Sequence, residues 1–113
     1  MARQNAVLAE LESLKERFGN QAAVAELLDV DKSSVTRWLK REDKPDPENE
    51  ERIAALRYVM LRLLKVFTPE AAMDWLLGVN AHLADQRPID LIKAGRVTEV
   101  LSAIEQADTG AYA

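Results

Sequence analysis

Residues 32–41, KSSVTRWLKR, hold the side chains with the clearest chemistry in the sequence. They include two lysines, two arginines and three hydroxyl side chains, and no acid. Lysine and arginine bind phosphate oxygens, while arginine, serine and threonine also hydrogen-bond the edges of bases. We therefore predict a DNA-binding surface in this stretch. Contacts to base edges or phosphates are expected from Gln21, Ser33, Ser34, Thr36 and Arg37, and contacts to phosphates from Lys32, Lys40 and Arg41.

Catalytic chemistry is not indicated anywhere in the chain. The sequence has no cysteine and a single histidine, His82, which rules out a Cys–His nucleophile and a histidine-cluster metal site. It has no glycine-rich phosphate loop, and its carboxylates are scattered singly. The sequence thus predicts a protein that is not an enzyme and has no cofactor and no metal site. For His82 we expect a structural place at a helix junction.

Two short helical patterns position the predicted DNA contacts. The first has one apolar face made of Val24, Ala25, Leu27 and Leu28. Asp29 and Val30 then mark a turn, and Asp31 stands where an N-cap belongs, because its carboxylate can accept hydrogen bonds from the free N–H groups of the next helix. The second helix is predicted to bury Val35, Trp38 and Leu39 and to present its cations outward.

This pair resembles the helix-turn-helix of Xre/Cro-type DNA-binding proteins, whose second helix enters the major groove. The matching positions are Gln21, Ala25, Val30, Val35 and Trp38. At two further positions the sequence departs from the family, since aspartates replace the turn glycine (Asp29) and the capping serine (Asp31). Aspartate tolerates the left-handed turn, but both carboxylates would repel phosphate. A helical hairpin that packs without contacting DNA is the alternative.

Composition limits where DNA binding can occur. The 113-residue chain has a net charge of −4 and is 48% hydrophobic, which favours a folded protein over a nucleic-acid coat. Residues 42–51 hold six acids and one lysine, and residues 52–113 balance seven acids with seven bases, so the basic charge is local to residues 32–41. Neither a signal peptide nor a membrane-length apolar run is apparent, and we expect a cytoplasmic protein.

The sequence outside residues 21–41 also predicts helices, and no stretch of it shows a strand pattern. A helix over 3–18 ends at Gly19 and Asn20. The acidic, proline-containing break after Arg41 leads into an apolar helix over 48–67, for which Asp46 can be the cap and Pro47 suits the first helical position. That helix is apolar on more than one side, so either a second copy of the chain or the C-terminal helices must cover it.

Shorter helical patterns follow over 68–78, 88–95 and 96–106. The first of them is expected to start with Thr68 as its cap and Pro69 at its first position. The predicted fold is all-α: an N-terminal helix-turn-helix lobe (1–45), a linker and long apolar dimerisation helix (46–67), and a small C-terminal helical lobe (68–113).

The stretch from Trp75 to Glu105 resembles the toxin-binding domain of Xre-type antitoxins that pair with RES-domain toxins. The resemblance rests on Trp75-Leu76, Asn80, Leu83, the run Arg87-Pro88-Ile89-Asp90-Leu91-Ile92, and Gly95.

The resemblance implies a type II toxin–antitoxin system. In such a system the antitoxin binds a toxin that degrades NAD⁺ and blocks its active site, and antitoxin homodimers also bind operator DNA. It also implies toxin contacts from the C-terminal tail, Thr109, Gly110, Ala111, Tyr112 and Ala113. Three alternatives are a frayed terminus with no such role, an antitoxin without DNA affinity, and a stand-alone helix-turn-helix transcriptional regulator.

Overall fold

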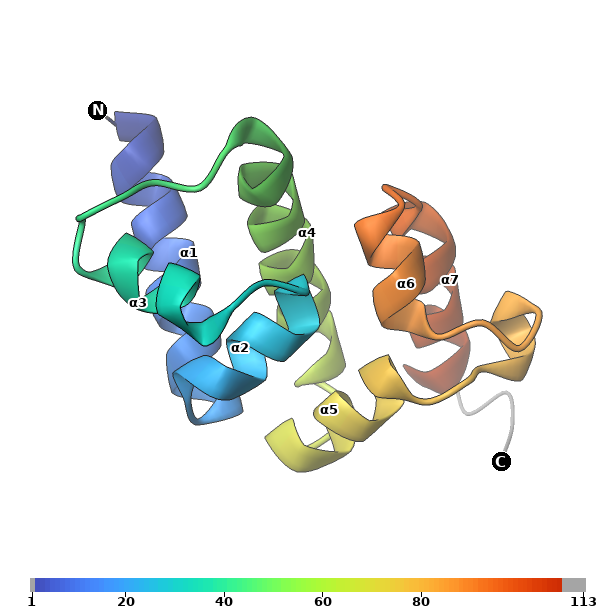
Figure 1. Cartoon of the computed structure of the whole chain (residues 1–113). Coiled ribbons are helices and arrows are strands. Elements are labelled where there is room, and N and C mark those ends of the chain that lie inside the picture. The colour runs from blue at the N-terminus through green and yellow to red at the C-terminus, as the bar shows by residue number, and fades with distance from the viewer. Residues whose placement is uncertain (1, 109–113) are drawn as a thin grey trace. The chain divides into compact units, whose positions relative to one another are not determined.

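Helices make up the regular structure of residues 2–108, the part of the chain that the computed structural model describes, with side chains from residue 6 onward. Seven α-helices and one 3-10 helix lie in this range, and its only β-type pairing is an isolated bridge between Asn80 and Gln86 (Figure 1). The predicted all-α class is confirmed. The helices divide between two units, Met1–Arg57 and Tyr58–Ala113, and the boundary falls inside α4 (Pro47–Leu63).

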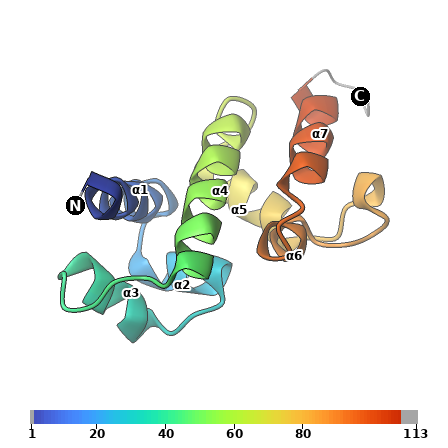
Figure 2. The ribbon, with the colours of Figure 1, turned by 90° about the horizontal axis from the view of Figure 1, so that it is seen from above.

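The first unit begins with three helices that contact one another: α1 (Ala2–Phe18), α2 (Gln21–Leu28) and α3 (Lys32–Leu39). Figure 2 shows α2 and α3 meeting at an angle, with α1 beside them. Gly19, at φ 93°, ends α1, and the side chain of Asn20 caps α2 by accepting a hydrogen bond from the Ala23 N–H at 2.7 Å. The buried apolar residues of these helices include Leu11, Leu14, Val24, Ala25, Leu27, Leu28, Val35 and Trp38. Leu39, which was also predicted to be buried, is only half-buried.

The turn between α2 and α3 takes the left-handed conformation at Asp29, with φ 59° and ψ 47°. The Val30 N–H donates to the Ala25 carbonyl at 3.0 Å, and the Asp29 N–H donates to the Glu26 carbonyl at 3.2 Å. These two bonds form a Schellman motif, which satisfies the last carbonyls of the helix. As predicted, an aspartate occupies the position where glycine is the usual residue.

Helix α4 starts as its sequence predicts and ends earlier. Asp46 caps it by accepting from the Asn49 N–H at 2.8 Å, and Pro47 fills its first position. The predicted helix ran to residue 67, but α4 ends at Leu63, and residues 64–66 form turns. The apolar pattern continues past the helix because the turn residues also carry apolar side chains, so periodicity alone could not mark this end.

The second unit contains α5 (Pro69–Leu77), the 3-10 helix η1 (Ala81–Leu83), α6 (Pro88–Lys93) and α7 (Val97–Asp108). Helix α6 contacts both α5 and α7, and α7 also contacts η1. Thr68 caps α5 through its hydroxyl, as predicted, and Gly95 closes α6 at φ 79°. The core of this unit includes Leu76, Leu83, Ile89, Leu91, Val100 and Ile104.

Candidate functional site

The basic surface, defined here as Lys32, Arg37, Lys40 and Arg41, is solvent-exposed at all four positions. Val35 and Trp38, on the opposite side of α3, are buried and hold the helix against its unit. The packing therefore turns the cations toward water, where a polyanion could reach them. Ser33 is also exposed, whereas Ser34 and Thr36 are half-buried.

Two of the predicted DNA contacts bind each other. The Thr36 hydroxyl on α3 donates to Gln21 Oε1 at the start of α2, at 2.6 Å, and the same hydroxyl lies 3.1 Å from the Lys32 carbonyl oxygen. Gln21 uses its oxygen in this bond, so its amide N–H groups remain the part that can donate to an anion. The bond fixes the start of α2 relative to α3.

Two more predicted contacts also meet, because Arg37 Nη2 donates to Ser34 Oγ at 3.2 Å within one turn of α3. A guanidinium has five N–H donors, so this bond leaves most of them available. Arg37 is thereby held against its own helix while its remaining donors face solvent. Sequence reasoning named these four residues individually and did not predict either pairing.

Lys40 and Arg41 lie beyond the end of α3, not on it. Arg41 has φ 63°, the left-handed conformation, and its N–H donates to the Trp38 carbonyl at 3.1 Å. The Glu42 N–H donates to the Arg37 carbonyl at 2.9 Å, which completes a second Schellman motif. The predicted second helix included both cations. In the structure α3 ends before them, and the left-handed conformation of Arg41 directs the chain away from the helix axis.

Asp31 occupies the predicted N-cap position of α3 but does not cap through its side chain. Its backbone is extended, with φ −69° and ψ 145°, and its carboxylate makes no cap hydrogen bond. Its backbone carbonyl accepts from the Ser34 N–H at 3.0 Å instead. The prediction that the Asp31 carboxylate caps α3 is therefore wrong, because this exposed side chain accepts no hydrogen bond from the first N–H groups of the helix.

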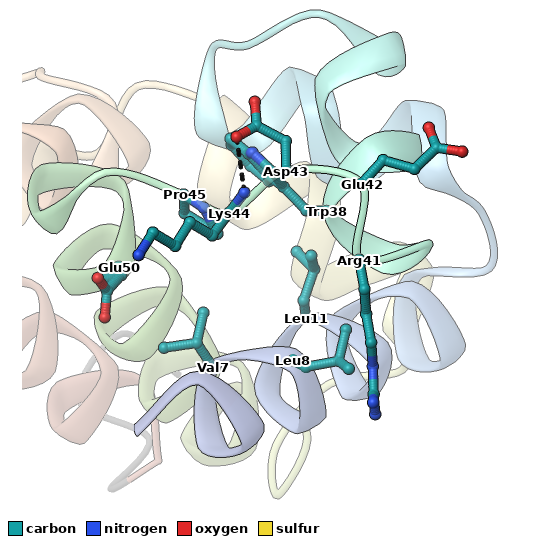
Figure 3. A pocket seen from close by; sticks show the side chains of 10 residues that line it. All are labelled: Val7, Leu8, Leu11, Trp38, Arg41, Glu42, Asp43, Lys44, Pro45 and Glu50. Atoms are coloured by element: carbon teal, nitrogen blue, oxygen red, sulfur yellow. Dashed lines mark hydrogen bonds between the residues drawn. The ribbon is translucent and has the colours of Figure 1, made fainter. Parts of the chain in front are cut away.

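An open pocket of about 400 Å³ lies within the first unit, next to the basic surface. Figure 3 shows α1 side chains on one side of it and the loop that follows α3 on the other. Val7, Leu8, Leu11 and Trp38 supply its apolar part, while the rim carries both charge signs. Its lining residues are Val7, Leu8, Leu11, Trp38, Arg41, Glu42, Asp43, Lys44, Pro45 and Glu50. Sequence periodicity gave no signal for this pocket, because it depends on the path of a non-helical loop.

The Pro88–Gly95 block of the second unit is held by local interactions. Arg87 makes a two-pronged ion pair with Asp90, with both N···O distances at 2.9 Å. The bond from Arg87 lowers the pKa of the Asp90 carboxyl from its ordinary value. The Arg96 N–H donates to the Leu91 carbonyl at 2.8 Å across Gly95, closing α6. Pro88, Ile89, Leu91 and Ile92 are buried, so this part of the predicted toxin-binding lobe is chiefly core.

A second, smaller pocket of about 260 Å³ lies between η1 and α7. Its lining includes His82, which is exposed and lies at the predicted helix junction. Arg96 and Glu99 form a two-pronged ion pair at its edge, and this pair lowers the pKa of Glu99 and raises that of Arg96.

The predicted toxin contacts Thr109, Gly110, Ala111, Tyr112 and Ala113 lie outside the described residues. Among residues 2–108, no group of three metal-binding side chains comes together, and no helix is long and apolar enough to cross a membrane.

The chain is similar in sequence to known antitoxins. It is 35% identical over 102 residues to the probable mycobacterial cidal antitoxin Rv3188 of Mycobacterium tuberculosis, a match that spans 90% of this chain and 87% of that protein. It is 28% identical over 109 residues to the mycobacterial cidal antitoxin MbcA of Mycobacterium bovis, spanning 96% of both chains. No protein-family model matches.

The fold has a counterpart in a solved structure. A chain in the crystal structure of the M. tuberculosis MbcT–MbcA toxin–antitoxin complex superposes with a TM-score of 0.73 at 27% identity, covering 91% of this chain and 94% of that one. Fold and sequence thus define the class of this protein as an antitoxin. More particularly, the chain belongs to the mycobacterial cidal antitoxin family. The resemblance to an antitoxin family is confirmed.

Proposed function

We propose that this protein binds a cognate RES-domain toxin and neutralises its NAD⁺-degrading activity by blocking the active site. The observation that carries the proposal is the 35% identity to a probable antitoxin over 90% of the chain. It is supported by the shared fold with a chain from a toxin–antitoxin complex, at a TM-score of 0.73. An antitoxin that acts by binding needs a shaped surface and no catalytic group.

Neutralisation is assigned to the C-terminal lobe, residues 68–113, and its tail. The Pro88–Gly95 block supplies a rigid base, because its apolar residues are buried and its ends are closed by hydrogen bonds. The tail, Thr109–Ala113, carries one aromatic side chain, Tyr112. An aromatic ring can fill an apolar pocket at little entropic cost. In the proposed mechanism the lobe binds the toxin and the tail enters the nucleotide cleft.

Deletion of Thr109 to Ala113 tests this division of labour. The truncated protein is expected to keep its fold and most of its toxin binding, while the toxin regains NAD⁺ consumption. Co-purification measures binding, and an NAD⁺ assay on the purified complex measures inhibition. Tyr112→Ala is the matched point variant and should restore part of the toxin activity. Full inhibition by the truncated protein would remove the tail from the mechanism.

A regulatory role is proposed for the N-terminal lobe, in which α2 and α3 act as a helix-turn-helix that binds the operator of the protein's own operon. Four exposed cations and the internally braced pairs Gln21–Thr36 and Ser34–Arg37 support it. Bracing lowers the entropic cost of ordering these side chains on DNA. A homodimer fits this role, since paired units read half-sites about 34 Å apart.

The second candidate function is a stand-alone transcriptional regulator, which the basic surface alone would also support. The two functions differ in one simple observation. An antitoxin has a toxin gene beside its own and co-purifies with that toxin, whereas a stand-alone regulator binds DNA and has no such partner.

A further inference from the structure

The pocket of the first unit has the size and lining of a small-molecule site. Its volume is about 400 Å³, and such sites typically measure roughly 300–1,000 Å³. Val7 and Leu8 of α1 and Trp38 of α3 contribute to its apolar part; Val7 and Trp38 are each 8% exposed, and Leu8 is half-buried. All the lining residues belong to the unit Met1–Arg57. The apolar part of a ligand would therefore contact side chains that one unit holds in place.

Hydrogen bonds hold the loop that forms the opposite wall of the pocket. The Glu42 N–H donates to the Arg37 carbonyl at 2.9 Å, and the Lys44 N–H donates to Asp43 Oδ1 at 2.8 Å. Pro45 follows and restricts the backbone further, because its ring fixes φ. A wall that is already ordered lowers the entropic cost of binding a ligand.

Charged side chains line the pocket but do not all face it. They are Arg41, Glu42, Asp43, Lys44 and Glu50. Figure 3 shows the carboxylates of Glu42 and Asp43 turned away from the space between the loop and α1. Glu50 already has an interaction partner. Within the residues that the structure describes, no hydrogen bond or ion pair engages the side chain of Arg41 or Lys44. These two cations are the charges with which a ligand can pair.

We propose that this pocket binds a small carboxylate that has an apolar body. The body lies against Val7, Leu8 and Trp38. The carboxylate pairs with Arg41 and Lys44, since guanidinium and ammonium groups both donate hydrogen bonds to carboxylate oxygens. The same two side chains repel a cationic ligand, and an uncharged ligand gains no ion pair from them.

The bound carboxylate also competes with DNA for Arg41. This residue belongs both to the pocket lining and to the basic surface. A guanidinium that holds a ligand carboxylate is less available to a DNA phosphate, so the ligand should weaken DNA binding about two- to fivefold. By linkage, DNA lowers the affinity for the ligand by the same factor. The competition rests on the proposed operator binding, whereas binding of the carboxylate does not.

Octanoate is the probe for the test, with octanamide as its uncharged counterpart and octylamine as its cationic one. An NMR titration of the full chain follows the indole N–H signal of Trp38. Trp75, the other tryptophan, does not line the pocket and is an internal control, and Trp75→Phe assigns the two signals. Octanoate should shift the Trp38 signal to saturation, leave Trp75 unchanged and bind about tenfold more tightly than octanamide. Octylamine should bind no better than octanamide.

Neutral substitutions of the two cations test the assignment of the carboxylate. Arg41→Gln and Lys44→Gln should each raise the Kd for octanoate about threefold, and the double variant should lose the preference for octanoate over octanamide. Lys15→Gln, the same substitution at an exposed position of α1 outside the pocket lining, should leave the Kd unchanged. Circular dichroism checks that each variant is folded.

The possible outcomes separate this inference from the proposed function. An unmoved Trp38 signal would overturn the pocket as a binding site, and equal affinities for octanoate and octanamide would overturn its assignment to a carboxylate. Fluorescence anisotropy on a duplex with the promoter of the protein's own operon then measures the competition, which should be present in the wild type and absent in Arg41→Gln. Unchanged DNA binding at saturating octanoate would overturn the competition. A protein that binds octanoate but no DNA would leave the pocket standing and remove the proposed regulatory role.

Discussion

Replacing Arg41 by glycine should make the protein more stable and, at the same time, weaken the proposed binding to DNA. Arg41 holds the left-handed conformation at φ 63°, at the end of α3. A residue with a Cβ pays about 1–2 kcal/mol for this conformation, whereas glycine adopts it freely. Arg41 is also one of the four exposed cations of the basic surface. One substitution therefore relieves backbone strain and removes a predicted phosphate contact.

The size of the stability gain follows from two opposing terms. Glycine removes backbone strain of roughly 1–2 kcal/mol from the folded state, which raises the free energy of unfolding. It also gives the unfolded chain more conformational freedom, which lowers the free energy of unfolding by about 0.4–1 kcal/mol. Because the Arg41 side chain is exposed, losing its packing should subtract little. The net stabilisation lies between about 0 and 1.6 kcal/mol, and its midpoint of about 0.8 kcal/mol corresponds to a rise in Tm of roughly 3–6 °C for a domain of this size. On DNA, losing one phosphate contact should reduce the slope of log K against log salt by about 0.9.

Lys40→Gly is the matched control, because it removes the same charge from the adjacent residue. Lys40 has φ −85° and ψ −1°, a conformation that needs no glycine, so this variant should lower Tm while weakening DNA binding to a similar degree. Differential scanning calorimetry and fluorescence anisotropy at several salt concentrations measure the two effects. A fall in Tm for Arg41→Gly would refute the strain argument, and an unchanged salt slope would remove Arg41 from the DNA surface.

Two further predictions concern the two units separately. Arg37→Ala should cost about 1–3 kcal/mol of specific operator binding, and Lys40→Ala should mainly flatten the salt dependence; an unchanged gel shift for the double variant would remove DNA binding from the proposed function. Asp90→Asn should destabilise the protein by a few tenths of a kcal/mol at pH 7, as expected for an exposed ion pair. Because the pKa of Asp90 is lowered in the folded state, the wild-type advantage is present above the ordinary carboxyl pKa, falls as the pH drops through the folded pKa, and vanishes below it. Thermal melts of both proteins from pH 7 to about pH 2.5 test this, and a constant difference would contradict it.

The helix ends show how far local sequence signals extend. Asp46 before Pro47 and Thr68 before Pro69 predicted two helix starts, and both caps form as expected. Such caps are decided within four residues, so a local signal can predict them. The signal is not sufficient, because Asp31 precedes α3 in the same way and makes no cap hydrogen bond. Asn20 carried the same kind of signal, since it is an N-cap residue immediately before an apolar pattern. The predicted role of Asn20 is only to end the first helix, whereas in the structure its side chain also caps α2.

Interactions between distant residues could not be predicted in this way. The Thr36–Gln21 bond joins residues 15 positions apart, and it exists because α2 and α3 cross at one particular angle. The left-handed backbone of Arg41 could not be predicted either, because arginine has no preference for this conformation. It accompanies the hydrogen bond from the N–H of Glu42 to the Arg37 carbonyl.

The sequence by itself determined that this protein is all-α, where most of its helices begin and end, that its positive charge gathers on residues 32–41, and that it resembles an antitoxin family. These properties depend on periodicity, capping and composition, which are local or additive. Only the tertiary structure decided which apolar side chains of α4 are covered. Met60 is fully buried while Tyr58 and Leu61 remain exposed, because burial depends on helices far away in the sequence. The tertiary structure likewise decided that Gln21 meets Thr36, since this hydrogen bond follows from how α2 and α3 pack.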